Sequence, residues 1–87
     1  MHLYFCLIDP ERNKFRSYSI AEQLTLYGAP DLVITWGRIG ARQRRRDEHF
    51  SSAAELTRRK RELLSRRQRH GYTMLGSSAL PAGPHRE

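Results

Sequence analysis

Arginine is the residue in this sequence with the clearest chemical use. Residues 38–69 hold twelve Lys and Arg against four Asp and Glu, a net charge of +8, whereas residues 1–37 have a net charge of −1. Arginine binds phosphate through two parallel hydrogen bonds, which lysine cannot make. Most runs of charge are only a solvated helix face, but this run is nearly all of one sign. It therefore predicts contact with a polyanion, in the first place nucleic acid.

No arrangement of residues indicates an enzyme. The four histidines and the single cysteine, Cys6, lack the spacing of metal ligands. The segment Trp36-Gly37-Arg38-Ile39-Gly40 lacks the further glycine and the lysine of a phosphate-binding loop. Asp47 and Glu48 follow three consecutive arginines and are best explained as charge partners, not as a general acid and base. We therefore expect no catalysis, no metal and no cofactor.

Length and composition limit the organisation of the chain. Its 87 residues, 38% of them hydrophobic, suffice for one small globular domain, which we place at residues 1–75. Residues 76–87, rich in Gly, Ser and Pro, are expected to form a disordered tail. Cys6 has no partner for an internal disulfide, and we find neither a signal peptide nor an apolar segment of about 18 residues. These features predict a cytoplasmic protein, associated with the nucleoid if it is bacterial.

Hydrophobic patterning positions the arginines on strands and one helix. Ser52 and Glu55 have the spacing of a helix capping box, and Gly71 supplies a stop, so a basic amphipathic helix is expected between them. Its apolar positions include Leu56 and Leu63. Apolar and β-branched runs predict strands over residues 2–8, 32–36 and 72–75. A partial alternation indicates a strand over residues 16–24, and a further strand is expected over residues 44–50, after Gly40.

Several short motifs together resemble the WGR domain. They are Leu26-Tyr27-Gly28, the segment from Leu32 to Gly40, Phe50 ahead of the helix, and Arg69-His70-Gly71-Tyr72. The resemblance covers about residues 13–72. It implies an α+β fold, a small antiparallel sheet with one helix packed across it. WGR domains occur beside the catalytic domain of DNA-damage-dependent poly(ADP-ribose) polymerases and as short stand-alone bacterial proteins. This sequence is similar to the latter, which implies no polymerase activity.

The resemblance also implies a binding site. In the polymerases the module binds DNA at strand breaks, where the motif Trp stacks on a sugar at the 5′ end and nearby basic and polar residues hold phosphate. By motif match, Trp36 is the stacking residue and Gly37 and Arg38 complete the motif. Without the resemblance, Trp36 would be read as a packing residue and Arg38 as a solvated charge. The candidate nucleic-acid-binding residues are Asn13, Lys14, Arg16, Trp36, Gly37, Arg38, Arg42, Arg44, Arg45, Arg46 and Arg58.

The sequence departs from the family pattern just after this motif. The family usually continues with a second Gly and then Gln, where this chain has Gln43 and Arg44. Gln accepts a positive φ poorly compared with Gly, so the family pattern does not determine the geometry of the loop after Gly40.

Two classes of function remain open. The first is a DNA-binding module that prefers ends, nicks or gaps, with RNA binding as a subordinate variant because stacking and phosphate contact do not exclude a ribose. The second is a protein-interaction or regulatory module whose arginines dock an acidic partner. The salt dependence of binding, measured with nucleic acid and with candidate proteins, separates the two classes.

Overall fold

The computed structural model describes residues 2–24 and 30–78. In chain order its elements are β1 (His2–Asp9), the short 3-10 helix η1 (Pro10–Arg12), β2 (Lys14–Leu24), β3 (Pro30–Arg38), β4 (Arg44–His49), α1 (Ala53–Arg69) and β5 (Thr73–Ser78). The Leu26-Tyr27-Gly28 motif and residues 79–87 of the predicted tail lie outside the described residues.

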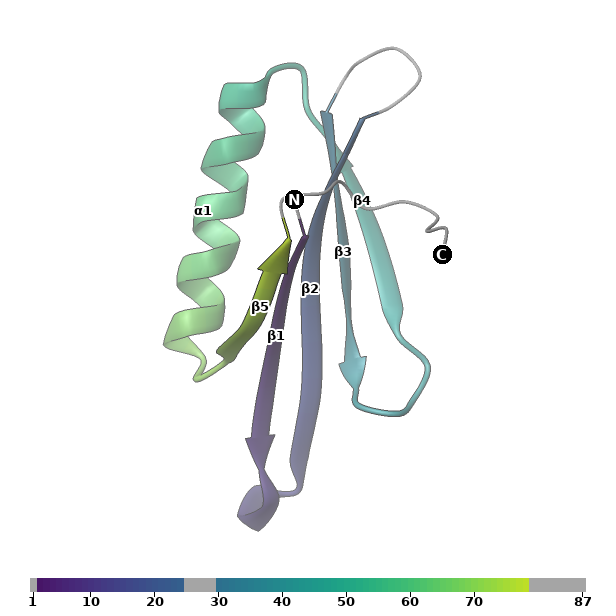
Figure 1. Ribbon diagram of the computed structural model, residues 1–87, viewed down its shortest axis with the longest axis vertical. Coiled ribbons are helices and arrows are strands. Elements are labelled where there is room, and N and C mark those ends of the chain that lie inside the picture. Colours follow the sequence, from purple (N-terminus) through teal and green to yellow (C-terminus); the bar gives the residue numbers. More distant parts are fainter. Residues whose placement is uncertain (1, 25–29, 79–87) are drawn as a thin grey trace.

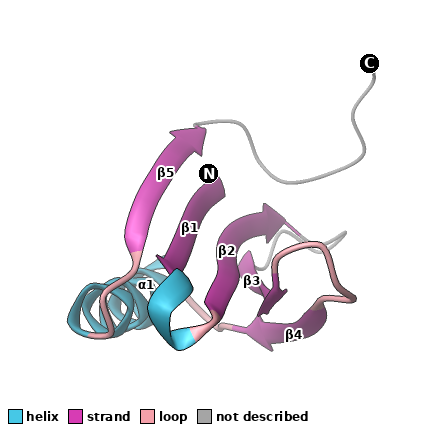
Figure 2. Cartoon of the chain, turned by 90° about the horizontal axis from the view of Figure 1, so that it is seen from below, coloured by secondary structure: helices cyan, strands magenta, loops and turns pink. Residues whose placement is uncertain are grey.

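The five strands form one antiparallel sheet in the order β4-β3-β2-β1-β5. α1 follows β4 at one edge, crosses a single face of the sheet and delivers the chain to β5 at the other edge (Figure 1). Figure 2 shows α1 on one side of the twisted sheet, and no helix of the described part covers the opposite face. The predicted α+β fold is confirmed.

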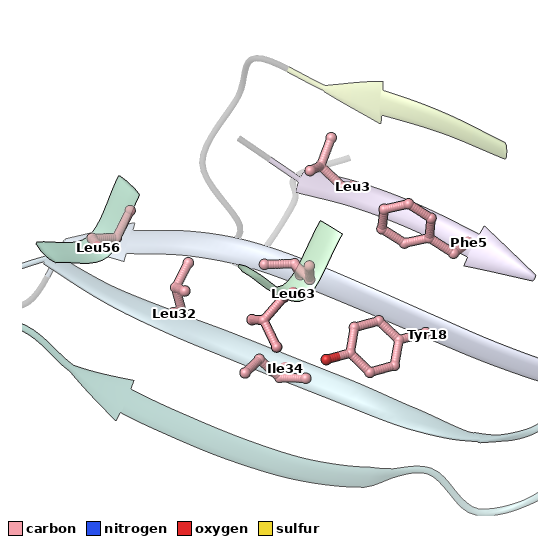
Figure 3. Close-up of a cluster of buried hydrophobic side chains, with 8 residues drawn as sticks. Leu3, Phe5, Tyr18, Leu32, Ile34, Leu56 and Leu63 are labelled. Atoms are coloured by element: carbon pink, nitrogen blue, oxygen red, sulfur yellow. The ribbon is translucent and has the colours of Figure 1, made fainter. Parts of the chain in front are cut away.

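Alternation along the strands builds the core between sheet and helix. Leu32 and Ile34 on β3 point toward α1 and are almost fully buried, at 0% and 1% exposed. Leu56 and Leu63 of α1 belong to the same buried cluster (Figure 3). They are seven residues apart and therefore lie on one side of the helix. The remaining buried members of this cluster, from β1 and β2, are Leu3, Phe5, Tyr18 and Ile20.

The strands extend beyond their predicted ends because backbone pairing continues where the side-chain pattern stops. β3 runs to Arg38, so the whole Trp-Gly-Arg motif lies in a strand. β5 runs to Ser78, because it pairs with β1 as far as His2, with a register shift between Tyr4 and Phe5 of β1.

α1 begins and ends at the predicted signals. The hydroxyl of Ser52 accepts a hydrogen bond from the backbone N–H of Glu55 at 3.2 Å. The Glu55 carboxylate accepts from the hydroxyl of Ser51 at 2.9 Å, one residue before the position that a capping box requires. At the other end Gly71 has φ +86°, and the N–H of Tyr72 closes the last turn on the carbonyl of Arg67.

Candidate nucleic-acid interface

Trp36 occupies the end of the apolar row on β3. It lies two residues beyond Ile34 on the helix-facing side, opposite Tyr18 of β2 and Arg44 of β4. The indole is half-buried and packs against the core. Its remaining surface lines two adjoining hollows at the junction of sheet and helix. The packing interpretation and the contact interpretation of Trp36 are therefore compatible, because one part of the ring packs on the core and another part lines the hollows.

The larger hollow, which we call the Trp36 groove, brings residues from four parts of the chain together. It has a volume of about 440 Å³. Five of its eight lining residues, Asn13, Arg16, Trp36, Gly37 and Arg38, belong to the candidate set from the sequence, and the other three are Tyr18, Arg67 and Tyr72. Three cationic side chains and three aromatic rings thus line one open hollow.

Arg38 is held in place by the turn that precedes β2. Its guanidinium donates to the backbone carbonyl of Asn13 at 3.2 Å and to the Asn13 side-chain oxygen at 3.1 Å. Its Cζ also lies 5.1 Å from the centre of the Phe15 ring. Asn13 presents both oxygens because it ends η1 in the left-handed conformation, φ +55°, which Asn tolerates better than most residues. The Arg38 guanidinium is therefore oriented before any ligand arrives.

Arg67 lines the Trp36 groove, and sequence reasoning did not include it among the candidates. Its Cζ lies 4.2 Å from the ring centre of Tyr18 and 5.0 Å from that of Tyr72, within the range of cation–π attraction. Its Nε is buried and has no hydrogen-bond partner among the described residues. Burial raises the pKa of the Tyr18 hydroxyl, and the positive charge of Arg67 opposes that rise. The available signal was helical spacing, because Arg67 stands four residues after buried Leu63, on the apolar stripe.

The loop between β3 and β4 is closed by Gln43. The Gln43 amide donates to the carbonyls of Arg38 at 2.9 Å and Ala41 at 3.1 Å, and its oxygen accepts from the Ser17 hydroxyl at 2.9 Å. Among the described non-glycine residues only Asn13 has a positive φ. The expected difficulty at Gln43 therefore does not arise. The side chain folds back over the backbone and stabilises the loop through hydrogen bonds.

Gly37 is needed where this loop returns. A Cβ at Gly37 would lie 3.1 Å from the Gln43 amide nitrogen and 3.2 Å from the Arg42 carbonyl oxygen. Such contacts are tighter than nearly all real Cβ contacts. The glycine of the motif thus lets the loop pack directly on β3.

The arginines of β4 divide between the two faces of the sheet. Arg44 and Arg46 lie on the helix-facing side, where Arg46 sits 6.0 Å from the centre of the Trp36 ring. Arg45 lies opposite Thr35 on the other face and pairs with Asp47 at 2.8 and 3.2 Å. The structure therefore does not bring Arg45 to the Trp36 groove.

Glu48 joins β4 to α1. Arg59 donates to both of its oxygens, at 2.8 and 3.0 Å, and Arg46 approaches it at 3.2 Å. The hydrogen bonds from Arg59 hold the pKa of the Glu48 carboxyl below its usual value. Glu48 is thus a charge partner, as the sequence indicated.

The remaining candidates lie in three different places. Lys14 begins β2 on the same side of the strand as Arg16, and Arg42 is exposed in the loop that Gln43 closes. Arg58 lines a separate depression on the outward side of α1, away from Trp36. The structure therefore does not bring Arg58 into the groove, because it stands only two residues after buried Leu56 and so points away from the sheet.

Two absences hold for residues 2–24 and 30–78. No group of three or more His, Cys, Asp or Glu side chains there is arranged to hold a metal ion. No helix there is long and apolar enough to span a membrane.

Comparison with known proteins agrees with this geometry. A family model described as the WGR domain matches residues 1–78. An uncharacterized protein, y4dW of Sinorhizobium fredii, is 33% identical over 70 residues, which are 80% of this chain and 34% of that protein. The chain thus spans about a third of the length of this curated relative. No solved structure matches the chain.

Proposed function

Because this chain belongs to the WGR domain family, a family of nucleic-acid-binding modules, we propose that it binds DNA at strand ends, nicks or gaps. In this proposal it acts as a binding module without catalysis, in the cytoplasm and, in a bacterium, at the nucleoid. The observation that supports it best is the composition of the Trp36 groove. There a partly exposed indole shares one hollow with the guanidinium groups of Arg38 and Arg67.

Stacking gives the preference for a break. An indole lies flat on a sugar or a base only where the stack of nucleotides is interrupted, because in a continuous duplex the next nucleotide covers that face. Trp36 is fixed by its packing on the core, so its exposed part is a rigid platform. Stacking on an aromatic side chain contributes about 1–3 kcal/mol per base.

Charge gives affinity for any DNA. Arg16, Arg38 and Arg67 surround the groove, and Arg44 and Arg46 continue the positive surface along β4. No base-reading motif accompanies them, so binding is expected to tolerate any sequence. If four to six phosphates are contacted, the logarithm of the binding constant falls against the logarithm of salt concentration with a slope of about −4 to −5.

The test is a titration of the protein against intact, nicked and blunt-ended duplexes of equal length. The parent protein should bind the nicked and blunt-ended duplexes more tightly than the intact one. Trp36→Ala should lose about 5- to 150-fold in affinity at the break, the equivalent of about 1–3 kcal/mol, and should bind nicked and intact duplexes almost equally.

The fold must be checked first, because removing a fully buried Trp side chain costs about 3–5 kcal/mol of stability and the half-buried Trp36 packs against the core. Trp36→Leu keeps apolar volume but removes the flat ring, so it provides a second variant if Trp36→Ala does not fold. A folded variant that still distinguishes nicked from intact duplex as well as the parent would show that Trp36 is structural. A salt slope near zero would exclude phosphate contact and favour a protein partner.

A further inference from the structure

Four arginines of α1 are left without partners by the fold. Arg58, Arg61, Arg66 and Arg69 are exposed, and the structure gives none of them a hydrogen bond or ion pair with a described residue. Together with Glu62 and Ser65 they line an open depression of about 560 Å³ on the outward side of the helix. We call this surface the outer face of α1.

The outer face is separate from the Trp36 groove. At 100° per residue, Arg58 and Arg69 project within about 20° of each other, whereas Arg67 projects about 180° from Arg58, toward the sheet. The body of the helix, about 10–12 Å across with its side chains, therefore stands between the two surfaces. Arg66 lies between them and also lines the smaller hollow beside Trp36.

We propose that the outer face of α1 is a second DNA-binding surface, so that one domain holds two separate segments of duplex. The inference takes from the proposed function only that the polyanion is DNA. It does not require a preference for breaks. From Arg58 to Arg69 the helix rises about 16 Å, and a duplex carries one phosphate charge per about 1.7 Å of its axis. The face therefore spans about ten phosphate charges of the two strands.

The residues of this face favour a phosphate backbone over an acidic protein. They are arginines, one serine and one glutamate, with no apolar or aromatic side chain among them. A protein interface normally has aromatic or aliphatic anchors at its centre, whereas a phosphate backbone requires only positive charge and hydrogen-bond donors. Glu62 does not neutralise the face on its own, because Arg59 binds its carboxylate at 3.0 Å from the side.

The test is capture of a second duplex. An intact duplex is fixed to beads, the protein is added, and a second, fluorescent intact duplex is supplied in solution. The parent protein should retain the fluorescent duplex on the beads. Arg58→Gln/Arg69→Gln should reduce this capture at least about tenfold at 0.1 M salt and lower the salt slope of capture by about 1.8, for two lost phosphate contacts.

A control variant with the same loss of charge separates a local effect from a general one. Arg12→Gln/Arg45→Gln removes two exposed arginines that are paired with Asp9 and Asp47 and that line neither the Trp36 groove nor the outer face, so it should capture as the parent does. The proposal is wrong if the parent captures no second duplex. It is also wrong if the outer-face variant captures the second duplex as well as the control variant does. That result would be expected if two copies of the protein associated and each held one duplex.

A nicked duplex in the same assay distinguishes this proposal from the proposed function. The outer-face variant should keep the parent's preference for a nicked over an intact duplex, because its groove is unchanged. Suppose that neither the parent nor any variant prefers the nicked duplex, and that only the outer-face variant loses capture. The break-binding function is then wrong, and the proposal of a second DNA-binding surface is supported.

Discussion

Both sides of α1 carry basic side chains, but those toward the sheet have partners and those facing outward have none among the described residues. On the side toward the sheet, Arg59 is bound to Glu48, Lys60 is bound to Glu22, and Arg67 lies between two tyrosine rings. On the outward side, Arg58 and Arg69 have no partner in the described part of the chain. One run of basic sequence therefore provides both fixed and free cations.

This difference matters because order in the free protein determines what binding costs. A long side chain that a ligand must immobilise loses about 0.5–1.5 kcal/mol in conformational entropy. Arg67 is already held by Tyr18 and Tyr72, so we expect its interaction with a ligand to be geometric and selective. We expect the outward arginines to adapt to any phosphate near them, with an electrostatic and unselective contribution. The following four predictions test this contrast, from the largest expected effect to the smallest.

The largest difference is expected between two arginines that are two residues apart. Arg67→Met keeps the apolar length of the side chain and removes its charge, which should weaken binding to a nicked duplex about 10- to 150-fold, for a charged hydrogen bond worth about 1.5–3 kcal/mol. Arg69→Met should weaken it about threefold or less. Titration with nicked duplex measures both, and equal losses would show that the enclosed position of Arg67 has no special role.

The Trp36 groove includes a backbone position, Gly37, at which an added methyl group should lower the stability of the fold. Gly37→Ala forces a methyl group against the Gln43 amide and the Arg42 carbonyl, and such overpacking lowers the free energy of unfolding by about 1–3 kcal/mol. Adding Gln43→Ala should recover part of this loss, because it removes one of the two obstacles. Urea denaturation of both single variants and the double variant measures the coupling, and strictly additive losses would contradict it.

The ion pair between Arg59 and Glu48 should make the free energy of unfolding depend on pH. Arg59 holds the pKa of Glu48 below its ordinary value of 4.5, so this pair stabilises the fold above that pH and the contribution is lost as pH falls through the lowered pKa. Glu48→Gln should therefore lower the free energy of unfolding by about 1–2 kcal/mol at pH 7. Denaturation followed over pH 2–7 should show parent and variant converging in acid. If the difference in free energy of unfolding between parent and variant stayed constant over this pH range, the ionised pair would contribute nothing to stability.

The smallest difference is expected between neighbours on β4. Arg44 lies on the groove side of the strand, and Arg45 lies on the other face with Asp47. Arg44→Gln should reduce the salt slope of DNA binding by about 0.9, the value for one phosphate contact. Arg45→Gln should leave the slope unchanged. Binding isotherms at several salt concentrations decide between them, and a reversed order would place the DNA on the open face of the sheet.

Much of the fold could be predicted because its signals are local. The strand over residues 32–36, the cap at Ser52 and the stop at Gly71 each depend on residues close together in the chain, and each proved correct. The strand ends were less predictable, because β5 reaches Ser78 only through pairing with β1, more than 70 residues away in sequence.

The candidate site was harder to predict, because it depends on which way each side chain points. The pairing register of β3 with β4 sends Arg45 to the far face, and a register is not visible in a run of three arginines. Arg67 meets Tyr18 only after α1 has crossed the sheet. The outward direction of Arg58, however, follows from its distance to Leu56, so helical periodicity alone could have excluded Arg58 from the candidate set.

The pairing of β1 with β5 has a consequence for larger proteins. His2 and Ser78, the first and last described residues, lie directly opposite each other in the sheet. Arg16 of the groove is opposite Leu7, five residues further along β1 and so about 17 Å from this point. A longer polypeptide can thus enter and leave the domain at one place while the groove stays open at the other end. Insertion of this domain into a longer polypeptide would therefore leave the groove uncovered.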